Sequence, residues 1–210
     1  MIIGAGGHAA VLLDTLIAQG EAEVVGFCDI DPARRGMVIF GVTVFGEDEL
    51  SKYPPSRVVL INGIGTVKAT AGRCAVYERY KRLEYSFASV IHPSVLMGCG
   101  VSINEGVQLM AGAIVQPRTV IGENSIVNTG ASIDHDCNIG KHVHLAPGCT
   151  LSGDVRVGDG SHVGTAATII EGVSIGLGVT VAAGSVVIRD VPDRATVAGV
   201  PARSIAPQTL

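Results

Sequence analysis

Sizeable aliphatic residues recur at every sixth position through the second half of the chain. The series runs from Ile91 to Val187 without a break. Its members are Ile91, Met97, Ile103, Leu109, Val115, Ile121, Val127, Ile133, Ile139, Leu145, Leu151, Val157, Val163, Ile169, Ile175, Val181 and Val187. This hexapeptide period is typical of a parallel β-helix, in which three six-residue faces make one coil of about 18 residues. We therefore expect about five stacked coils with these side chains buried.

A second column lies two positions before each aliphatic and holds small or β-branched residues. It includes Val101, Ala113, Thr119, Ser125, Ala131, Cys137, Cys149 and Ser185. Small residues are needed where a chain turns a tight corner. We therefore expect Cys137 and Cys149 to have a packing role. The chain has five cysteines and no CxxC spacing, which favours reduced thiols over disulfides or zinc ligands.

The first 88 residues have a different pattern. An apolar start (Met1–Ile3) leads through a glycine turn into a helical pattern that stops at Gly20. Further strands are expected at 23–29 and 57–61, and a second helix at 66–83. Alternation of this kind predicts a small parallel sheet with helices, a half-Rossmann-like α/β domain. We expect this domain to span 1–88 and a β-helix domain with a C-terminal tail to span 89–210. Because the first strand is short, a few native residues are expected to precede Met1.

Composition and charge narrow the class of partner. Glycine makes up 28 of 210 residues, about 13% against a usual ~7%, and mean hydropathy is +0.44. This composition excludes a disordered chain and a helix bundle. The net charge of −4 and the absence of a Lys/Arg run argue against nucleic acid and anionic membranes as partners. No apolar stretch reaches the ~18 residues of a membrane span, so we expect a cytoplasmic protein.

The first glycine turn has the features of a nucleotide-binding loop. Its sequence GAGGHA satisfies G-x-G-x-x-A, in which glycines let a phosphate approach the backbone at a helix N-terminus. Asp29 ends the next strand, where a carboxylate can meet ribose hydroxyls. The domain has no second half for a dinucleotide, so a sugar nucleotide is the better fit. The candidate residues are Gly6, Gly7, His8 and Asp29; for His8, capping of the first helix is the alternative.

A histidine in the repeat region is the candidate catalytic base. Imidazole titrates near neutral pH, and His135 lies between Asp134 and Asp136, either of which can hold its tautomer. One coil later the same column holds Gly153, which predicts room for an acyl group and a backbone N–H facing a thioester oxygen. His144 is a second candidate, expected to stack on His162 on an outer surface. The alternative is that His135 and His144 are ordinary solvent-exposed histidines without a catalytic role.

A metal site is the competing interpretation of the same cluster. His135, Asp136, His142 and His144 lie within ten residues and are all metal-ligating types. On a triangular coil, however, they fall on different faces and corners of one subunit. We therefore expect no metal.

Several motifs together resemble one known family. They are GAGGHA, the unbroken hexapeptide array, IDHDCNIG at 133–140, HVHLAPG at 142–148 and VAGVPAR at 197–203. Over essentially the whole chain they resemble the sugar O-/N-acyltransferases of the sialic-acid and bacillosamine pathways. The resemblance implies a left-handed β-helix, a homotrimer with active sites between subunits, and acetyl-CoA in the groove between neighbouring subunits. It also implies acetylation of a nucleotide-linked 4-amino-4,6-dideoxy sugar.

The resemblance adds three sets of residues. It favours Asp136 over Asp134 as the partner of His135. It places the second glycine turn, with Gly63 and Gly65, beside the nucleotide. Small residues repeat at every eighteenth position in Ala146, Gly164 and Ala182, and we expect them to form a strip along which CoA binds. The alternative is that the corners of the coil simply prefer small residues. Gly153 is a further candidate for CoA binding.

Two other functions stay open. One is O-acetylation of a sialic acid or another sugar hydroxyl by the same fold and base. The other is a non-catalytic or carbonic-anhydrase-like β-helix, which needs histidines from two subunits around a metal. The sequence does not distinguish UDP, GDP and dTDP as the nucleotide.

Overall fold

The computed structural model describes residues 1–20, 22–66 and 70–205. It divides into two compact units, Met1–Pro93 and Ser94–Leu210. The described part has no helix that is long and apolar enough to cross a membrane.

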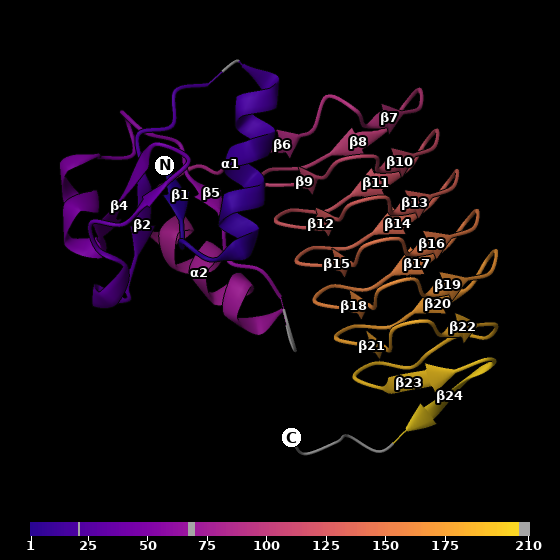
Figure 1. Ribbon diagram of the computed structural model, residues 1–210. Helices are drawn as coiled ribbons and strands as arrows, with labels where there is room; N and C mark the ends of the chain where they lie inside the picture. The colour runs from indigo at the N-terminus through magenta and orange to yellow at the C-terminus, as the bar shows by residue number, and fades with distance from the viewer. Residues whose placement is uncertain (21, 67–69, 206–210) are drawn as a thin grey trace. The chain divides into compact units, whose positions relative to one another are not determined.

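The first unit is a small α/β domain. Its five-stranded sheet has the order β3-β4-β2-β1-β5, and all neighbours are parallel except the β3-β4 hairpin. Figure 1 shows these strands with the helices α1 (Gly7–Gln19) and α2 (Ala71–Arg82). The strands and 3-10 helices are β1 (Ile2–Ile3), β2 (Phe27–Asp29), η1 (Pro32–Arg34), β3 (Val38–Ile39), β4 (Val42–Gly46), η2 (Glu47–Lys52) and β5 (Ile61–Asn62). A further strand, β6 (Val90–Ile91), is not part of this sheet.

The glycine turn and α1 form as the sequence predicts. Leu12, Leu13 and Leu16 recur at helical spacing and are buried. Gly20 ends the helix in the left-handed conformation with a φ of 68°, and its N–H donates to the Leu16 carbonyl.

The other elements of this unit are shorter than the sequence predicts. The strand expected at 23–29 starts at Phe27, and the one expected at 57–61 is a strand at Ile61–Asn62. Both pair with β1, which spans two residues, so each has only two residues in register with it. Helix α2 starts at Ala71 rather than at 66, and residues 67–69 of the expected helix lie outside the described residues.

The second unit is a parallel β-helix. Each strand from Leu96 to Val187 is two residues long and pairs with the strand exactly one coil away, at a spacing of 18 residues, as in Ser132 with Ile114 and Thr150. Figure 1 shows the successive coils stacked on one another. Its strands are β7 (Leu96–Met97), β8 (Ser102–Ile103), β9 (Gln108–Leu109), β10 (Ile114–Val115), β11 (Val120–Ile121), β12 (Ile126–Val127), β13 (Ser132–Ile133), β14 (Asn138–Ile139), β15 (His144–Leu145), β16 (Thr150–Leu151), β17 (Arg156–Val157), β18 (His162–Val163), β19 (Thr168–Ile169), β20 (Ser174–Ile175), β21 (Thr180–Val181) and β22 (Val186–Val187).

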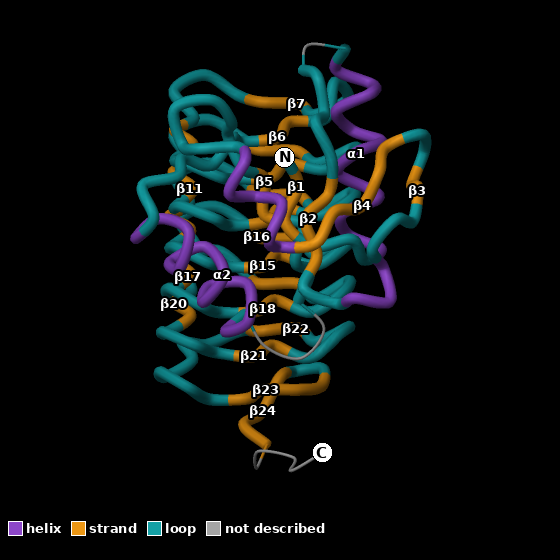
Figure 2. Tube along the Cα trace, turned by 90° about the vertical axis from the view of Figure 1, so that its left-hand side faces the viewer, coloured by secondary structure: helices purple, strands orange, loops and turns teal. Residues whose placement is uncertain are grey.

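The faces of the β-helix are three parallel sheets. One contains β7, β10, β13, β16, β19 and β22; the second contains β8, β11, β14, β17 and β20; the third includes β9, β12, β15, β18 and β21. Figure 2 shows β15, β18 and β21 stacked in the third sheet. That sheet continues into a hairpin of β23 (Thr196–Gly199) and β24 (Ala202–Ile205), which carries the VAGVPAR motif.

The corners explain the column of small residues. Ser125 and Ser161 are buried, and each hydroxyl donates to a backbone carbonyl fifteen residues later, at Gly140 and Gly176. Cys137 makes the equivalent contact to the Ser152 carbonyl at 3.2 Å. Burial raises the pKa of Cys137 to about 11 and that of Cys149 to about 12, which fits a packing role for both thiols.

The predicted aliphatic column is buried from the second coil onward. Leu109, Val115, Ile121 and Leu145 are fully buried. The first coil corrects the prediction: Ile91 and Ile103 are half-buried, and Met97 is 50% exposed. They belong to β6, β7 and β8, the edge strands of their sheets, so one side of each side chain has no neighbouring strand to pack against.

Candidate active site

The centre of the candidate site is the turn after β13. The His135 Nδ1–H donates to Asp136 Oδ2 at 2.7 Å. Asp134 instead accepts the backbone N–H of His135 through Oδ1, also at 2.7 Å. Asp136 is therefore the carboxylate that orients the ring, and Asp134 closes the turn.

Arg118, one coil earlier, holds the same carboxylate in a bidentate ion pair. Its Nε lies 2.6 Å from Asp136 Oδ1 and its Nη2 lies 2.7 Å from Oδ2. The Arg118 and His135 hydrogen bonds lower the pKa of Asp136 to about 2, so it is ionised at neutral pH. The hydrogen bond to Asp136 raises the pKa of His135. The sequence analysis missed Arg118; the signal was an arginine 18 residues before an aspartate.

The hydrogen bond to Asp136 determines which ring nitrogen of His135 carries the proton in the neutral ring. Because Nδ1 donates to a carboxylate, Nε2 is the acceptor in the neutral ring. The His135 side chain is about half exposed, so part of the ring faces solvent. His135 therefore has the arrangement of an oriented general base.

Gly153 lies against the imidazole, which corrects the expected open space. A methyl group at Gly153 would lie 2.6 Å from His135 Cε1 and 2.9 Å from Nε2. The ring itself therefore occupies the room that the absent side chain provides. Glycine at this position is required by the histidine conformation.

His144 lies on another face of the coil. It is on β15, its Nε2 is 3.0 Å from Asn128 Nδ2, and its ring is 5.0 Å from that of His162 in an edge contact. The predicted contact with His162 is confirmed, but the His144 side chain is buried rather than on an open surface. Within one chain, His135 lies in the turn after β13, whereas His144 is on β15, which belongs to another sheet.

The described residues contain no group of three or more His, Cys, Asp and Glu side chains that could hold a metal ion. His142 lies in the turn before β15, where its Nδ1 is 2.9 Å from Asn124 Nδ2.

The two predicted glycine loops meet at the carboxyl end of the N-terminal sheet. A methyl group at Gly65 would lie 3.1 Å from the His8 Cβ, and one at Gly63 would lie 2.7 Å from the Ile3 carbonyl oxygen. Asn62 shapes the second loop, because its Oδ1 accepts the Ile64 N–H and its Nδ2 donates to the Arg73 carbonyl. The loops therefore form one backbone surface at the edge where ligands of parallel sheets bind.

Asp29 organises the first loop. Its Oδ2 accepts the Ala5 N–H at 2.7 Å and its Oδ1 accepts the Asp31 N–H at 2.9 Å. Arg34, which the sequence analysis did not single out, donates from Nη1 to the Ala5 carbonyl at 2.6 Å. Helix α1 starts beside these groups, with Gly6 as N-cap and no acidic residue in its first turn. A helix N-terminus and a guanidinium together favour an anionic group such as phosphate.

Comparison with known proteins shows the family. The N-terminal part, residues 1–78, matches the family described as PglD N-terminal domain, and residues 118–153 match the bacterial transferase hexapeptide family. No match was found among curated protein sequences. A mutant of GDP-perosamine N-acetyltransferase from Caulobacter crescentus, solved with CoA and GDP-perosamine, is 38% identical with a TM-score of 0.90 over 98% of this chain and 95% of that chain. The chain belongs to the sugar acyltransferase family of hexapeptide-repeat proteins.

Two further solved structures agree. The acetyltransferase domain of PglB from Neisseria gonorrhoeae, solved with acetyl coenzyme A, is 34% identical with a TM-score of 0.89, over 97% of each chain. WeeI from Acinetobacter baumannii is 25% identical with a TM-score of 0.88, over 97% of this chain and 98% of that chain. This sugar acyltransferase thus combines a small α/β domain with a left-handed β-helix, as the family resemblance implies.

The small residues proposed for CoA occupy equivalent places in three successive coils of the acyltransferase. Ala146, Gly164 and Ala182 follow β15, β18 and β21. Ala146 and Gly164 are buried, and Ala182 is half-buried. A methyl group at Gly164 would lie 2.6 Å from the Ala183 nitrogen, so contact between coils already explains this glycine. A role in CoA binding stays a prediction for these positions.

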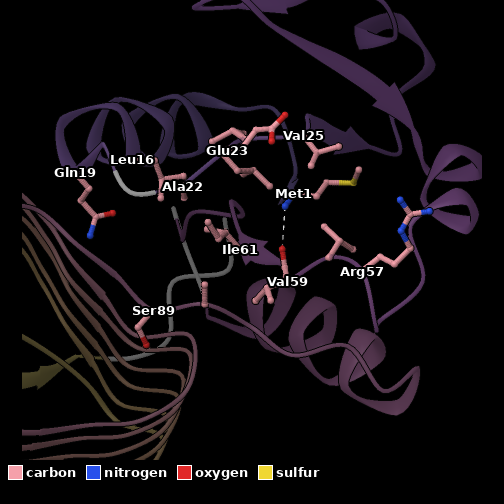
Figure 3. Close-up of a pocket in the computed structure, with 14 residues that line it drawn as sticks. Met1, Leu16, Gln19, Ala22, Glu23, Val25, Arg57, Val59, Ile61 and Ser89 are labelled. Atoms are coloured by element: carbon pink, nitrogen blue, oxygen red, sulfur yellow. Dashed lines mark hydrogen bonds between the residues drawn. The ribbon is translucent and has the colours of Figure 1, made fainter.

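A cavity of about 360 Å³ lies at the other end of the N-terminal sheet of the acyltransferase. Figure 3 shows Val25, Val59 and Ile61 on its wall, and the Met1 amino group donating to the Val59 carbonyl at 2.9 Å. None of the glycine-loop residues lines this cavity. It is therefore separate from the surface that the two loops form.

Proposed function

We propose that this acyltransferase uses acetyl-CoA to acetylate the amino group of a nucleotide-linked 4-amino-4,6-dideoxy sugar. The observation that carries the proposal is the similarity to the Caulobacter GDP-perosamine N-acetyltransferase, which extends over almost the whole of both chains. The oriented His135 and the anion-favouring loop surface supply the chemistry that this reaction needs.

In the proposed reaction the free amine attacks the thioester carbonyl, and Nε2 of His135 accepts its proton. Asp136, ionised and bonded to Nδ1, stabilises the imidazolium that forms. The new C–N bond replaces the C–S bond, and the imidazolium returns the proton to the departing CoA thiolate. The Gly153 backbone lies against the ring, and we assign its N–H to the thioester oxygen.

The nucleotide diphosphate is assigned to the loop surface of the N-terminal domain. The N-terminus of α1 at Gly6 and Gly7, with His8 and Arg34, faces the phosphates in this proposal. The second loop with Gly63 and Gly65 forms the other wall. Asp29 holds the first loop and meets the ribose.

We further propose a homotrimer with each active site between two subunits. His135 follows β13 and His144 is on β15, strands of two different sheets, which supports a site that takes the two histidines from two subunits. In the assembly, His144 of a neighbouring subunit and the strip with Ala146, Gly164 and Ala182 contribute to acetyl-CoA binding.

Product analysis tests the proposed reaction. The purified protein is incubated with acetyl-CoA and a nucleotide-linked 4-amino sugar, and the product is treated with hydroxylamine. An amide survives this treatment, whereas an ester is cleaved. A stable acetylated product supports N-acetylation; a cleaved product supports O-acetylation, and no acetyl transfer contradicts the proposal for this amine.

Replacing Asp29 is expected to affect one substrate selectively. Asp29→Ala removes an acceptor from two backbone N–H groups and loosens the nucleotide loop. Hydrogen bonds to a charged group contribute roughly 1.5–3 kcal/mol, so KM for the nucleotide sugar rises roughly 10–100-fold while KM for acetyl-CoA stays within about twofold. Steady-state kinetics measures both, with the exposed Asp14→Ala in α1 as control. Equal changes in KM for the two substrates would contradict the assignment of Asp29 to the nucleotide site.

Adding a methyl group at Gly153 is expected to displace the base. Gly153→Ala puts a carbon 2.6 Å from His135 Cε1, so the ring must move. A misplacement of about 1 Å can cost about 100-fold in rate, and we expect kcat to fall roughly 10–100-fold. Gly72→Ala is the control, because a methyl group there meets open space. A Gly153→Ala enzyme with wild-type kcat would show that the observed ring position is not needed for catalysis.

A further inference from the structure

We propose that Arg118 is a positioning residue for His135: it fixes the Asp136 carboxylate on the imidazole and competes with the imidazolium for the negative charge. The proposal rests on the proposed role of His135 as the base. It concerns a residue that acts through Asp136 and is not assigned any contact with substrate.

The geometry is a chain of three side chains from two successive coils. Arg118 occupies both oxygens of Asp136, and Oδ2 also accepts the His135 Nδ1–H at 2.7 Å. A single carboxylate oxygen is thus shared between the guanidinium and the imidazole. Arg118 and Asp136 both adopt a positive φ, 62° and 60°, at corners one coil apart.

The exposure of this ion pair argues against a role in stability. The Arg118 side chain is 67% exposed and that of Asp136 is 38% exposed. Exposed ion pairs contribute little to folding, so a merely structural role predicts little change in any property when Arg118 is replaced. A bidentate grip on the carboxylate that orients a base predicts a change in catalysis.

The charges around His135 define the direction of the effect. Asp136 and Asp134 raise the pKa of His135, and the positive charge of Arg118 lowers it. In the next coil, the Asp154 N–H donates to the His135 carbonyl, and the Asp154 carboxylate pairs with Arg156. Removing Arg118 leaves these acidic neighbours in place, so His135 stays protonated to a higher pH. A protonated imidazole is not a base, and activity is lost at the acid side.

The test compares pH profiles of kcat/KM and the His135 ring titration followed by nuclear magnetic resonance in the free enzyme. Arg118→Met is expected to move the acid limb and the ring titration to higher pH and to lower kcat about tenfold at neutral pH. Arg118→Lys keeps the positive charge but loses the bidentate geometry. The acid limb of its pH profile should therefore stay near the wild-type position, while kcat still falls. Both variants should melt within about 3 °C of wild type.

Lys141→Met is the matched control. Lys141 pairs with Glu123, also 18 residues apart and exposed, at another corner of the β-helix. Its profile, titration and kcat should match wild type. If Arg118→Met behaves like this control, or moves the limb to lower pH, the proposal for Arg118 is wrong. If His135→Ala still shows the wild-type acid limb, the titrating base is another group and the proposed function of His135 fails instead.

Discussion

Replacing His135 by alanine is expected to lower kcat by about 100- to 10,000-fold, the usual contribution of a positioned base. The variant removes the acceptor Nε2, which the Asp136 hydrogen bond on Nδ1 keeps unprotonated in the neutral ring. The loss falls on the transition state, so KM for acetyl-CoA should stay nearly unchanged. Steady-state kinetics on the amino sugar measures this effect.

His142→Asn is the control for that experiment. His142 has a φ of 56°, and Asn124 adopts the same value one coil earlier, so asparagine suits the position. We expect kcat within about twofold of wild type for this control. A His135→Ala enzyme with kcat within a few-fold of wild type means that the amine loses its proton to water or another residue, and His144 becomes the next candidate.

The second large effect concerns the β-helix core. Leu145→Ala is expected to lower the free energy of unfolding by about 2–5 kcal/mol, because it leaves a cavity between coils. Leu145 is fully buried and lies in register with Val127 and Val163. For a protein of this size the midpoint of thermal unfolding should fall by about 5–20 °C.

Met97→Ala is the matched control, since Met97 belongs to the same aliphatic column at the edge of the β-helix. Its side chain is 50% exposed, so less apolar contact is lost and the midpoint should fall by less than about 4 °C. Equal losses for the two variants would show that the stacked column does not provide the core. Thermal unfolding followed by circular dichroism measures both.

The β-helix could be predicted from the sequence because its period is local. Each strand repeats the same six-residue pattern, so the aliphatic column alone locates the strands from β7 to β22. The α/β domain was harder, because its strands depend on distant partners. The hairpin of Val38–Ile39 and Val42–Gly46 was missed, although Gly41 at its tip is a turn signal.

In the candidate site, too, contacts between sequence neighbours could be predicted and contacts between coils could not. His135 and Asp136 are neighbours in sequence, and their hydrogen bond follows from local geometry. Arg118 reaches Asp136 only because two coils stack in register, which a search of adjacent residues does not detect. Gly153 was predicted as an open space, but the space holds the ring, because side-chain conformation is not encoded in spacing.

A crystal structure of the His135→Asn variant with CoA and the nucleotide amino sugar tests the central claim most directly. We expect the sugar amine to lie about 3 Å from the side chain at position 135, the usual reach of a general base, with the CoA sulfur beside Gly153. The diphosphate should lie on the loops held by Asp29. An amine bound more than about 8 Å from position 135, beyond direct or water-mediated proton transfer, would contradict the account.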